Sequence, residues 1–100
     1  MAFDGAYLKL MVAGGDDHPN FWSYKTADAA AAVDSANYFA NGLAFGLKAY
    51  DLILRTTVTN LGASNEAFAN SGFHVVNAAD AAAGTIDVAD TVALSGTDTD

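Results

Sequence analysis

The stretch Asp51–Asn60, DLILRTTVTN, decides the class of this fold. Its side chains fall into two alternating sets, which are Leu52, Leu54, Thr56 and Val58, and Ile53, Arg55, Thr57 and Thr59. A period of two combined with many β-branched residues is typical of a β-strand, because branched side chains pack well on a pleated surface. We therefore predict a strand here and assign the rest of the chain around it.

Two further strands are predicted on the N-terminal side. Ala6–Ala13, AYLKLMVA, alternates with one clearly apolar face, and Phe21–Thr26, FWSYKT, has the aromatic composition of a strand. Between them lies Gly14–Asn20, GGDDHPN, which is dense in turn formers. The first two strands are therefore expected to pair as a hairpin.

A helix is predicted between this hairpin and the central strand. Its apolar positions follow helical spacing at Ala29, Ala32, Val33 and Ala36. Thr26 or Asp28 is expected to cap its N-terminus. About three turns are too short to be stable alone in water, so the helix must pack on the domain, with Phe39 as its anchor. Ala40–Tyr50 is predicted to be a glycine-punctuated connection.

The C-terminal half is predicted to alternate irregular segments with short strands. Leu61–Gly72 is expected to be a long irregular segment, Phe73–Asn77 a strand, and Ala78–Gly84 a turn. Thr85–Leu94 has in-phase apolar residues interrupted at Asp90, which indicates two short strands separated by a bulge or bend.

These segments predict one domain over residues 1–100, with a possible N-terminal strand or arm at 1–13 and a polar tail at 95–100. The fold class is mainly β (α+β): a small antiparallel barrel or sandwich of five to six strands with one short alanine-rich helix. Much of the hydrophobic content is alanine, so the core is thin for its length. A small core is often completed by oligomerisation or by docking on a partner.

The charge excludes several classes of partner. The net charge is −8, and the four basic residues, Lys9, Lys25, Lys48 and Arg55, are scattered singly. Nucleic-acid binding requires clustered basic residues that replace phosphate counterions, so we predict no nucleic-acid partner and no anionic membrane partner. The absence of cysteine excludes disulfides and thiolate metal sites. No leader segment or membrane span is expected.

No catalytic, cofactor or metal site is predicted. Consecutive turn residues such as Asp16, Asp17 and His18 rarely converge on a metal, and His74 lacks a nucleophile motif beside it. The aspartates at positions 80, 87 and 90 match no calcium loop, and GLAFG (42–46) lacks the lysine of a phosphate loop. We therefore predict that the chain is not an enzyme.

Apolar and aromatic residues near the N-terminus suggest a contact with protein instead. Aromatic residues are enriched at interface cores, and NFWSYK (20–25) crowds three of them into four positions. In a strand, either Phe21 or Trp22 must point away from the core, where it is either covered by another element or free. The predicted partner-interface residues are Tyr7, Leu8, Leu10, Met11, Phe21, Trp22, Tyr24 and Phe68.

Three segments carry a resemblance to a known family. FWSYKTADAAAAVDSANYF (21–39), preceded by MAFDGAYLKLMVAGG and followed by HVVNAADAAAGTIDVADTVAL, resembles small virion structural proteins of tailed bacteriophages, encoded near the major capsid gene. The likeness covers nearly the whole chain and is strongest from Trp22 to Thr26 and at Tyr38–Phe39. Family members have a glycine before YF and an LKVGD turn, where this chain has Asn37 and LKAYD (47–51). Asn37 can adopt the left-handed conformation of such a glycine, whereas Tyr50 is a larger departure.

The resemblance implies a capsid decoration (cement) protein on the outer surface of the virion, made in the bacterial cytoplasm. It would bind the lattice of the major capsid protein through residues 2–13 and 21–24, with no cofactor, and form a homo-oligomer such as a trimer or other cyclic cluster. The alternative is a head-fibre or tail-associated host-recognition module that binds surface glycan through the segment Leu61–Gly72 and Phe68.

Overall fold

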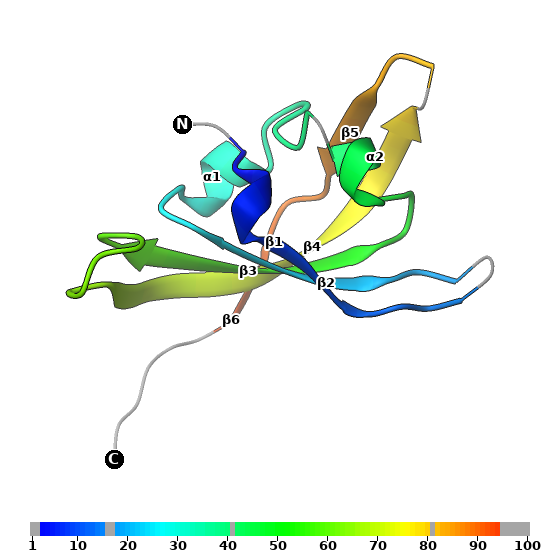
Figure 1. The fold of residues 1–100 in the computed structure, drawn as a ribbon. Coiled ribbons are helices and arrows are strands. Elements are labelled where there is room, and N and C mark those ends of the chain that lie inside the picture. The colour runs from blue at the N-terminus through cyan, green and yellow to red at the C-terminus, as the bar shows by residue number, and fades with distance from the viewer. Residues whose placement is uncertain (1–2, 16–17, 41, 81, 95–100) are drawn as a thin grey trace.

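The computed structural model describes residues 3–15, 18–40, 42–80 and 82–94. Figure 1 shows a twisted sheet with the helical segments on one side. The strands are β1 (Leu8–Val12), β2 (Phe21–Thr26), β3 (Leu52–Thr59), β4 (Ala67–Asp80), β5 (Thr85–Val88) and β6 (Val92–Leu94). The helical segments are the 3₁₀ turn η1 (Gly5–Tyr7) and the single-turn helices α1 (Ala30–Val33) and α2 (Gly42–Phe45).

The strands form one mixed sheet in the order β1-β2-β3-β4, and both β5 and β6 pair with β4. β2 and β3 are parallel, from Phe21 opposite Leu52 to Thr26 opposite Thr57, and the other pairs are antiparallel. The predicted mainly β fold of five to six strands is confirmed. The sheet is not wholly antiparallel, because the helix-bearing segment 27–51 crosses over before β3, as a parallel connection requires. It is not closed into a barrel, since β1 pairs only with β2 among the described strands.

The strand predictions on the N-terminal side are confirmed, and one on the C-terminal side is wrong. β2 occupies the predicted residues, and β1 pairs with it as a hairpin. Leu61–Gly72 is irregular only as far as Glu66, because β4 begins at Ala67 and pairs with β3 along its length. Pairing with a neighbouring strand overrides the weak strand propensity of AFANSG. For the same reason β4 continues to Asp80, into the predicted turn.

The predicted interruption near Asp90 is present. β5 and β6 both run antiparallel to β4 and are separated by residues 89–91. The carbonyl of Ala89 accepts a hydrogen bond from the His74 ring at 2.9 Å, and Thr91 Oγ1 lies 3.4 Å from an Arg55 guanidinium nitrogen. The break between the two strands is therefore held by side chains from the sheet.

The helix is much shorter than predicted. α1 is one turn, its N-cap Ala29 offers no side-chain bond, and Thr26 Oγ1 instead accepts from the N–H of Asp28. After the helix the chain turns, and Asn37 adopts a left-handed φ of 57°. The tight turns after Val33 end the helix before its second turn forms. The helix α2 was not predicted, because GLAF carries two residues that disfavour confident assignment, a glycine and a β-prone phenylalanine.

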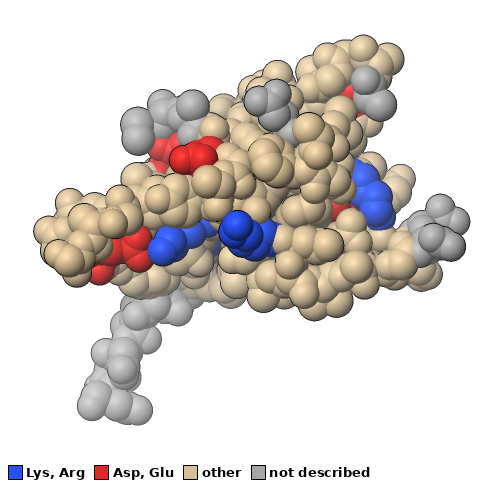
Figure 2. Space-filling model, in the orientation of Figure 1, with Lys and Arg blue, Asp and Glu red and all other residues tan. Residues whose placement is uncertain are grey.

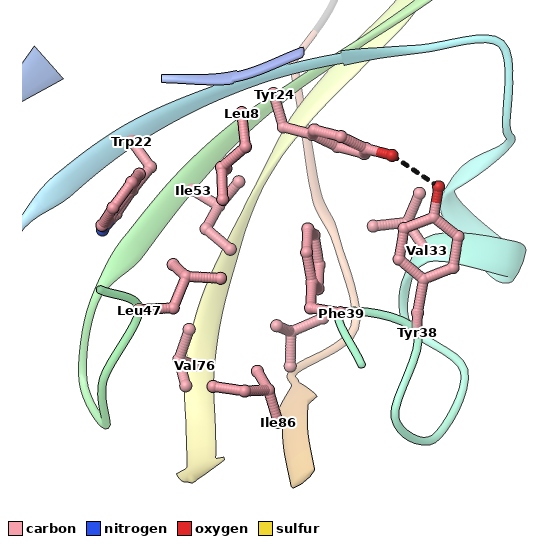
Figure 3. Packing of buried hydrophobic residues seen from close by; sticks show 11 residues of the cluster. Leu8, Trp22, Tyr24, Val33, Tyr38, Phe39, Leu47, Ile53, Val76 and Ile86 are labelled. Carbon is pink, nitrogen blue, oxygen red and sulfur yellow. Dashed lines mark hydrogen bonds between the residues drawn. The ribbon is translucent and has the colours of Figure 1, made fainter. Parts of the chain in front are cut away.

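The core lies between the helix-covered face of the sheet and the segment 30–47 (Figure 3). Its buried members are Leu8, Trp22, Tyr24, Val33, Tyr38, Phe39, Leu47, Ile53, Val76, Ile86 and Val88. Phe39 is 1% exposed and anchors the segment after α1, as predicted. Phe3 packs against it with ring centroids 5.1 Å apart, so the N-terminal segment closes the core.

Candidate protein-interaction surface

The more apolar face of the central strand β3 is not the face that meets the core. Burial alternates along β2 and along β3 as far as Thr57, and the buried set on β3 begins with Ile53, Arg55 and Thr57. Leu52 and Leu54 therefore lie on the other side of the sheet, although they are more apolar than Arg55 and Thr57. An apolar side chain that does not face the core is informative when it belongs to a contiguous group.

Such a group exists on the sheet face opposite the helices. We call it the apolar outer face, and its residues are Phe21, Leu52, Leu54, Phe73, Val75, Val92 and Leu94. The three most accessible, Val75, Val92 and Leu94, are 42%, 66% and 40% exposed. The other four are partly exposed.

Strand register brings these residues together from four strands. Phe21, Leu52 and Val75 lie opposite one another across β2, β3 and β4. The next row contains Leu54, Phe73 and Val92. The Phe21 and Phe73 rings are 6.1 Å apart between centroids, which joins the two rows. The result is a continuous apolar grid, because residues paired across neighbouring strands share one side of the sheet.

No described element covers the apolar outer face. We call β1, β2, β3, β6 and the part of β4 that pairs with β3 and β6 the main sheet. Figure 1 shows η1, α1, α2 and β5 on its opposite side. None of the seven residues belongs to the buried core cluster. Within the described residues, this face is therefore in contact with solvent.

The apolar outer face also lacks carboxylates, although the chain has a net charge of −8. Figure 2 views the sheet from its edge, and the Asp and Glu side chains visible there lie on the helix side and toward the ends of the molecule. Lys9 and Lys25 lie on the same side of the sheet, in the rows of Ser23 and Thr56. Lys25 Nζ lies 3.0 Å from a carboxylate oxygen of Glu66. The hydrogen bond from the Gly62 N–H lowers the pKa of Glu66 most strongly, and the bond from Lys25 lowers it further.

A second accessible apolar element is the edge strand β1. Among the described strands, β1 pairs only with β2, so its other edge presents unpaired backbone groups. Three consecutive side chains, Leu10, Met11 and Val12, are 49%, 51% and 58% exposed. A register shift between Leu10 and Val12 bends the strand there.

The structure corrects part of the predicted interface. Leu8, Trp22 and Tyr24 are at most 4% exposed and belong to the core, so their assignment to a partner surface is wrong. Leu10 and Met11 are exposed on the edge strand, Tyr7 is partly buried, and Phe21 lies on the apolar outer face. Phe68 is 54% exposed but belongs to β4, so it does not lie in a loop as expected.

Six of the seven residues of the apolar outer face were missed from the sequence. They are Leu52, Leu54, Phe73, Val75, Val92 and Leu94. The alternation of β3 reveals two faces but does not identify the one that meets the helices. A signal was nevertheless present, because both sets of β3 contain large apolar residues, Leu52 and Leu54 in one and Ile53 in the other. A strand that is apolar on both faces indicates cover on both sides.

Two buried polar clusters have the composition of a reactive site, but their contacts are structural. Arg55 and His74 are each 1% exposed, and Arg55 Nε donates to His74 Nε2 at 3.0 Å. Tyr24 Oη and Tyr38 Oη lie 2.8 Å apart (Figure 3), and Tyr38 donates to Asp28 Oδ2. Burial, followed by the bond to Asp28, raises the pKa of Tyr38. Neither cluster opens to a pocket, since none was found in the described surface.

The carboxylates considered as ligands are not gathered by the fold. Asp80 Oδ1 accepts the N–H groups of Ala82 and Ala83 at the end of β4. Among the described residues, no three His, Asp or Glu side chains are grouped so that they hold a metal ion. Asp16 and Asp17 lie outside the described residues. The prediction that the chain is not an enzyme stays a prediction.

Within the described ranges, no helix has the length and hydropathy needed to cross a bilayer. Comparisons with protein-family models, curated proteins and solved structures gave no match to this chain. The surfaces of the molecule and the resemblance of its sequence are therefore the indications of its function.

Proposed function

We propose that this protein is a structural protein of a tailed-phage virion, a capsid decoration protein that binds the lattice of the major capsid protein and stabilises the head. The proposal begins from the sequence resemblance of residues 1–15, 21–39 and 74–94. The observation of the structure that carries it is the edge strand β1, with Leu10, Met11 and Val12 about half exposed in succession. An apolar edge strand of this kind supports a role in assembly.

The edge strand supports a lattice contact for two reasons. Its free backbone groups offer main-chain hydrogen bonds to an extended segment of another protein, and its side chains offer apolar area. One short strand makes a weak contact, but a decoration protein binds a symmetric lattice in many copies. Linked copies gain effective concentration, which compensates for a small individual interface.

The host-recognition alternative keeps only the part of its proposed contact at Leu61–Glu66 and Phe68. It required a long exposed loop over Leu61–Gly72, whereas Ala67–Gly72 is strand paired with β3. Phe68 remains exposed, but no described polar cluster adjoins a pocket that would orient a sugar. We therefore favour the decoration function.

Quantitative mass spectrometry of purified virions tests the function. A decoration protein should be present in many copies, in a fixed ratio to the major capsid protein, and should rebind heads from which it has been removed. Absence from the particle, or a few copies confined to the tail, would contradict the proposal.

Substitutions on the edge strand test the contact. Leu10→Glu and Met11→Glu place charge on exposed positions of β1 and should reduce rebinding to stripped heads at least tenfold, which corresponds to about 1.4 kcal/mol. Ala31→Glu adds the same charge on an exposed position of α1 and should rebind normally. Deletion of residues 2–13 is a poor test, because it removes Phe3 and Leu8 from the core.

A further inference from the structure

We infer that the apolar outer face is the contact between two copies of this chain, packed sheet against sheet about a two-fold axis that runs parallel to the strands. This inference does not depend on the decoration function. The two surfaces adjoin at Val12, which pairs with Phe21, whereas Leu10 pairs with the core residue Trp22. The dimer would form, between two molecules, a sandwich, which is one of the two architectures, barrel or sandwich, that the sequence predicts within one.

The described part of the chain contains no element that covers this face. The described helical segments lie on the opposite side of the sheet (Figure 1). The longest stretch outside the described residues is 95–100, SGTDTD, which contains no large apolar side chain. The remaining stretches are one or two residues long. A contiguous apolar grid of seven residues is the type of surface that associates with protein.

Charge favours a second copy as the occupant. Two chains of net charge −8 repel each other through most of their surfaces, and the free energy of association is least opposed where carboxylates are absent. The apolar outer face has none. In a sheet-on-sheet dimer the carboxylates of the helix side point away from the partner, with both sheets between them. The two apolar faces remove each other from water without bringing acidic groups together.

The same reasoning selects the symmetry. A two-fold axis parallel to the strands places β1 of one copy over β6 of the other, since these strands lie at opposite edges of the main sheet. Lys9, in the row of Leu54 and Val92, then approaches the β6 edge of the second copy, and the two Lys9 side chains stay at opposite rims. The alternative axis, perpendicular to the strands, would stack β1 on β1 and bring both lysines together.

The size of the face sets the expected affinity. Four strands at about 4.8 Å and three residue rows at about 7 Å give a projected area of roughly 400 Å². A standard interface buries about 800 Å² on each partner. We therefore expect a concentration-dependent dimer, populated in the micromolar to millimolar range, which high local concentration would favour.

The test is the mass of the purified full-length chain in solution, measured by light scattering and sedimentation up to about 1 mM. The expected result is a shift from the 10.3 kDa monomer toward twice that mass as concentration rises. Val75→Glu, at an exposed position of the face, should leave the circular dichroism spectrum unchanged and weaken the dimer at least tenfold. Leu10→Glu, the same kind of change at a similarly exposed position of β1, should leave the dimer intact.

Three outcomes would overturn the inference. A wild-type chain that stays monomeric up to 1 mM has no self-contact on this face. A dimer that persists in Val75→Glu and in the second face variant Val92→Glu uses another surface. A trimer or larger ring excludes the two-fold arrangement. These results are independent of head binding, so failure here leaves the decoration function standing, and failure of the decoration function leaves the dimer standing.

Discussion

Arg55 Nε donates a 3.0 Å hydrogen bond to Nε2 of His74 on the helix-covered face of the sheet. Each residue is 1% exposed, and the remaining side-chain partners of the guanidinium are the neutral groups of Thr57, Asn70 and Thr91. Because Nε2 accepts, the proton of the neutral ring sits on Nδ1, which donates to the Ala89 carbonyl at 2.9 Å. A neutral His74 is therefore required for this network.

The first prediction is that acid weakens the fold through His74. Burial lowers the pKa of His74 below 6.5 against the opposing effect of the Ala89 bond, and the Arg55 charge lowers it further. Between the folded and unfolded pKa values the unfolded chain binds more protons, so its population rises as pH falls. The stability from neutral His74 is complete above pH 6.5 and is lost as pH falls from 6.5 through the folded pKa.

Urea unfolding measured at pH steps from about 8 to 5 checks this. His74→Gln should remove this part of the pH dependence, because glutamine can accept from Arg55 and does not titrate. His18→Gln, at an exposed position, should retain the wild-type profile. A His74→Gln profile parallel to that of the wild type would contradict the assignment.

The second prediction concerns the shape of Arg55. Its Nε donates to His74, and one terminal nitrogen, Nη1, donates to both Thr57 and Asn70. The single ammonium of a lysine cannot occupy both nitrogen positions. Arg55→Lys should lower the free energy of unfolding by about 2–3 kcal/mol, since buried acceptors lose their donors. Lys9→Arg, on the surface, should change it by less than about 0.5 kcal/mol. Equal effects in chemical denaturation would show that the network contributes little.

The third prediction is that Asp51 joins the ends of β2 and β3. Its carboxylate is fully buried and accepts the Asn20 N–H and the Trp22 indole N–H, both at 2.8 Å. Asp51→Ala should cost about 2–4 kcal/mol, because these donors stay buried without an acceptor. The fluorescence of Trp22, the only tryptophan of the chain, should change in the folded variant. Asp80→Ala, at an exposed position, should cost no more than about 1 kcal/mol.

The fourth prediction concerns backbone strain at Tyr50. Its φ is 77°, in the left-handed region, and its side chain is 74% exposed. Tyr50→Gly should raise the free energy of unfolding by up to about 1 kcal/mol, because the strain relieved exceeds the entropy that glycine gains when unfolded. Tyr50→Ala keeps the Cβ and should show no gain. Asn37→Gly, at a φ of 57°, should be close to neutral, since asparagine tolerates this conformation. Thermal unfolding distinguishes these outcomes, and a gain in Tyr50→Ala equal to that in Tyr50→Gly would exclude strain.

Comparison of individual elements shows what local pattern can reveal. The Phe21–Thr26 strand, the central strand and the break at Asp90 were predicted from alternation and turn residues, because these signals act over a few neighbouring residues. The helix after Asp28 was predicted to be too long, because the spacing of its alanines does not indicate the turns that end it at Val33. The N-terminal part of β4 was missed because its strand state depends on pairing with β3 and not on its own residues.

The sequence by itself determined that the chain has a mainly β fold, where β2 and β3 lie, and that either Phe21 or Trp22 must face outward. Only the tertiary structure decided that Trp22 is core and Phe21 surface, that Arg55 lies inside while Leu52 and Leu54 lie outside, and that Val92 joins them. The physical reason is that a strand presents two equivalent faces to its own sequence. The packing of residues 30–47 against one of them makes that face the core and leaves the other exposed.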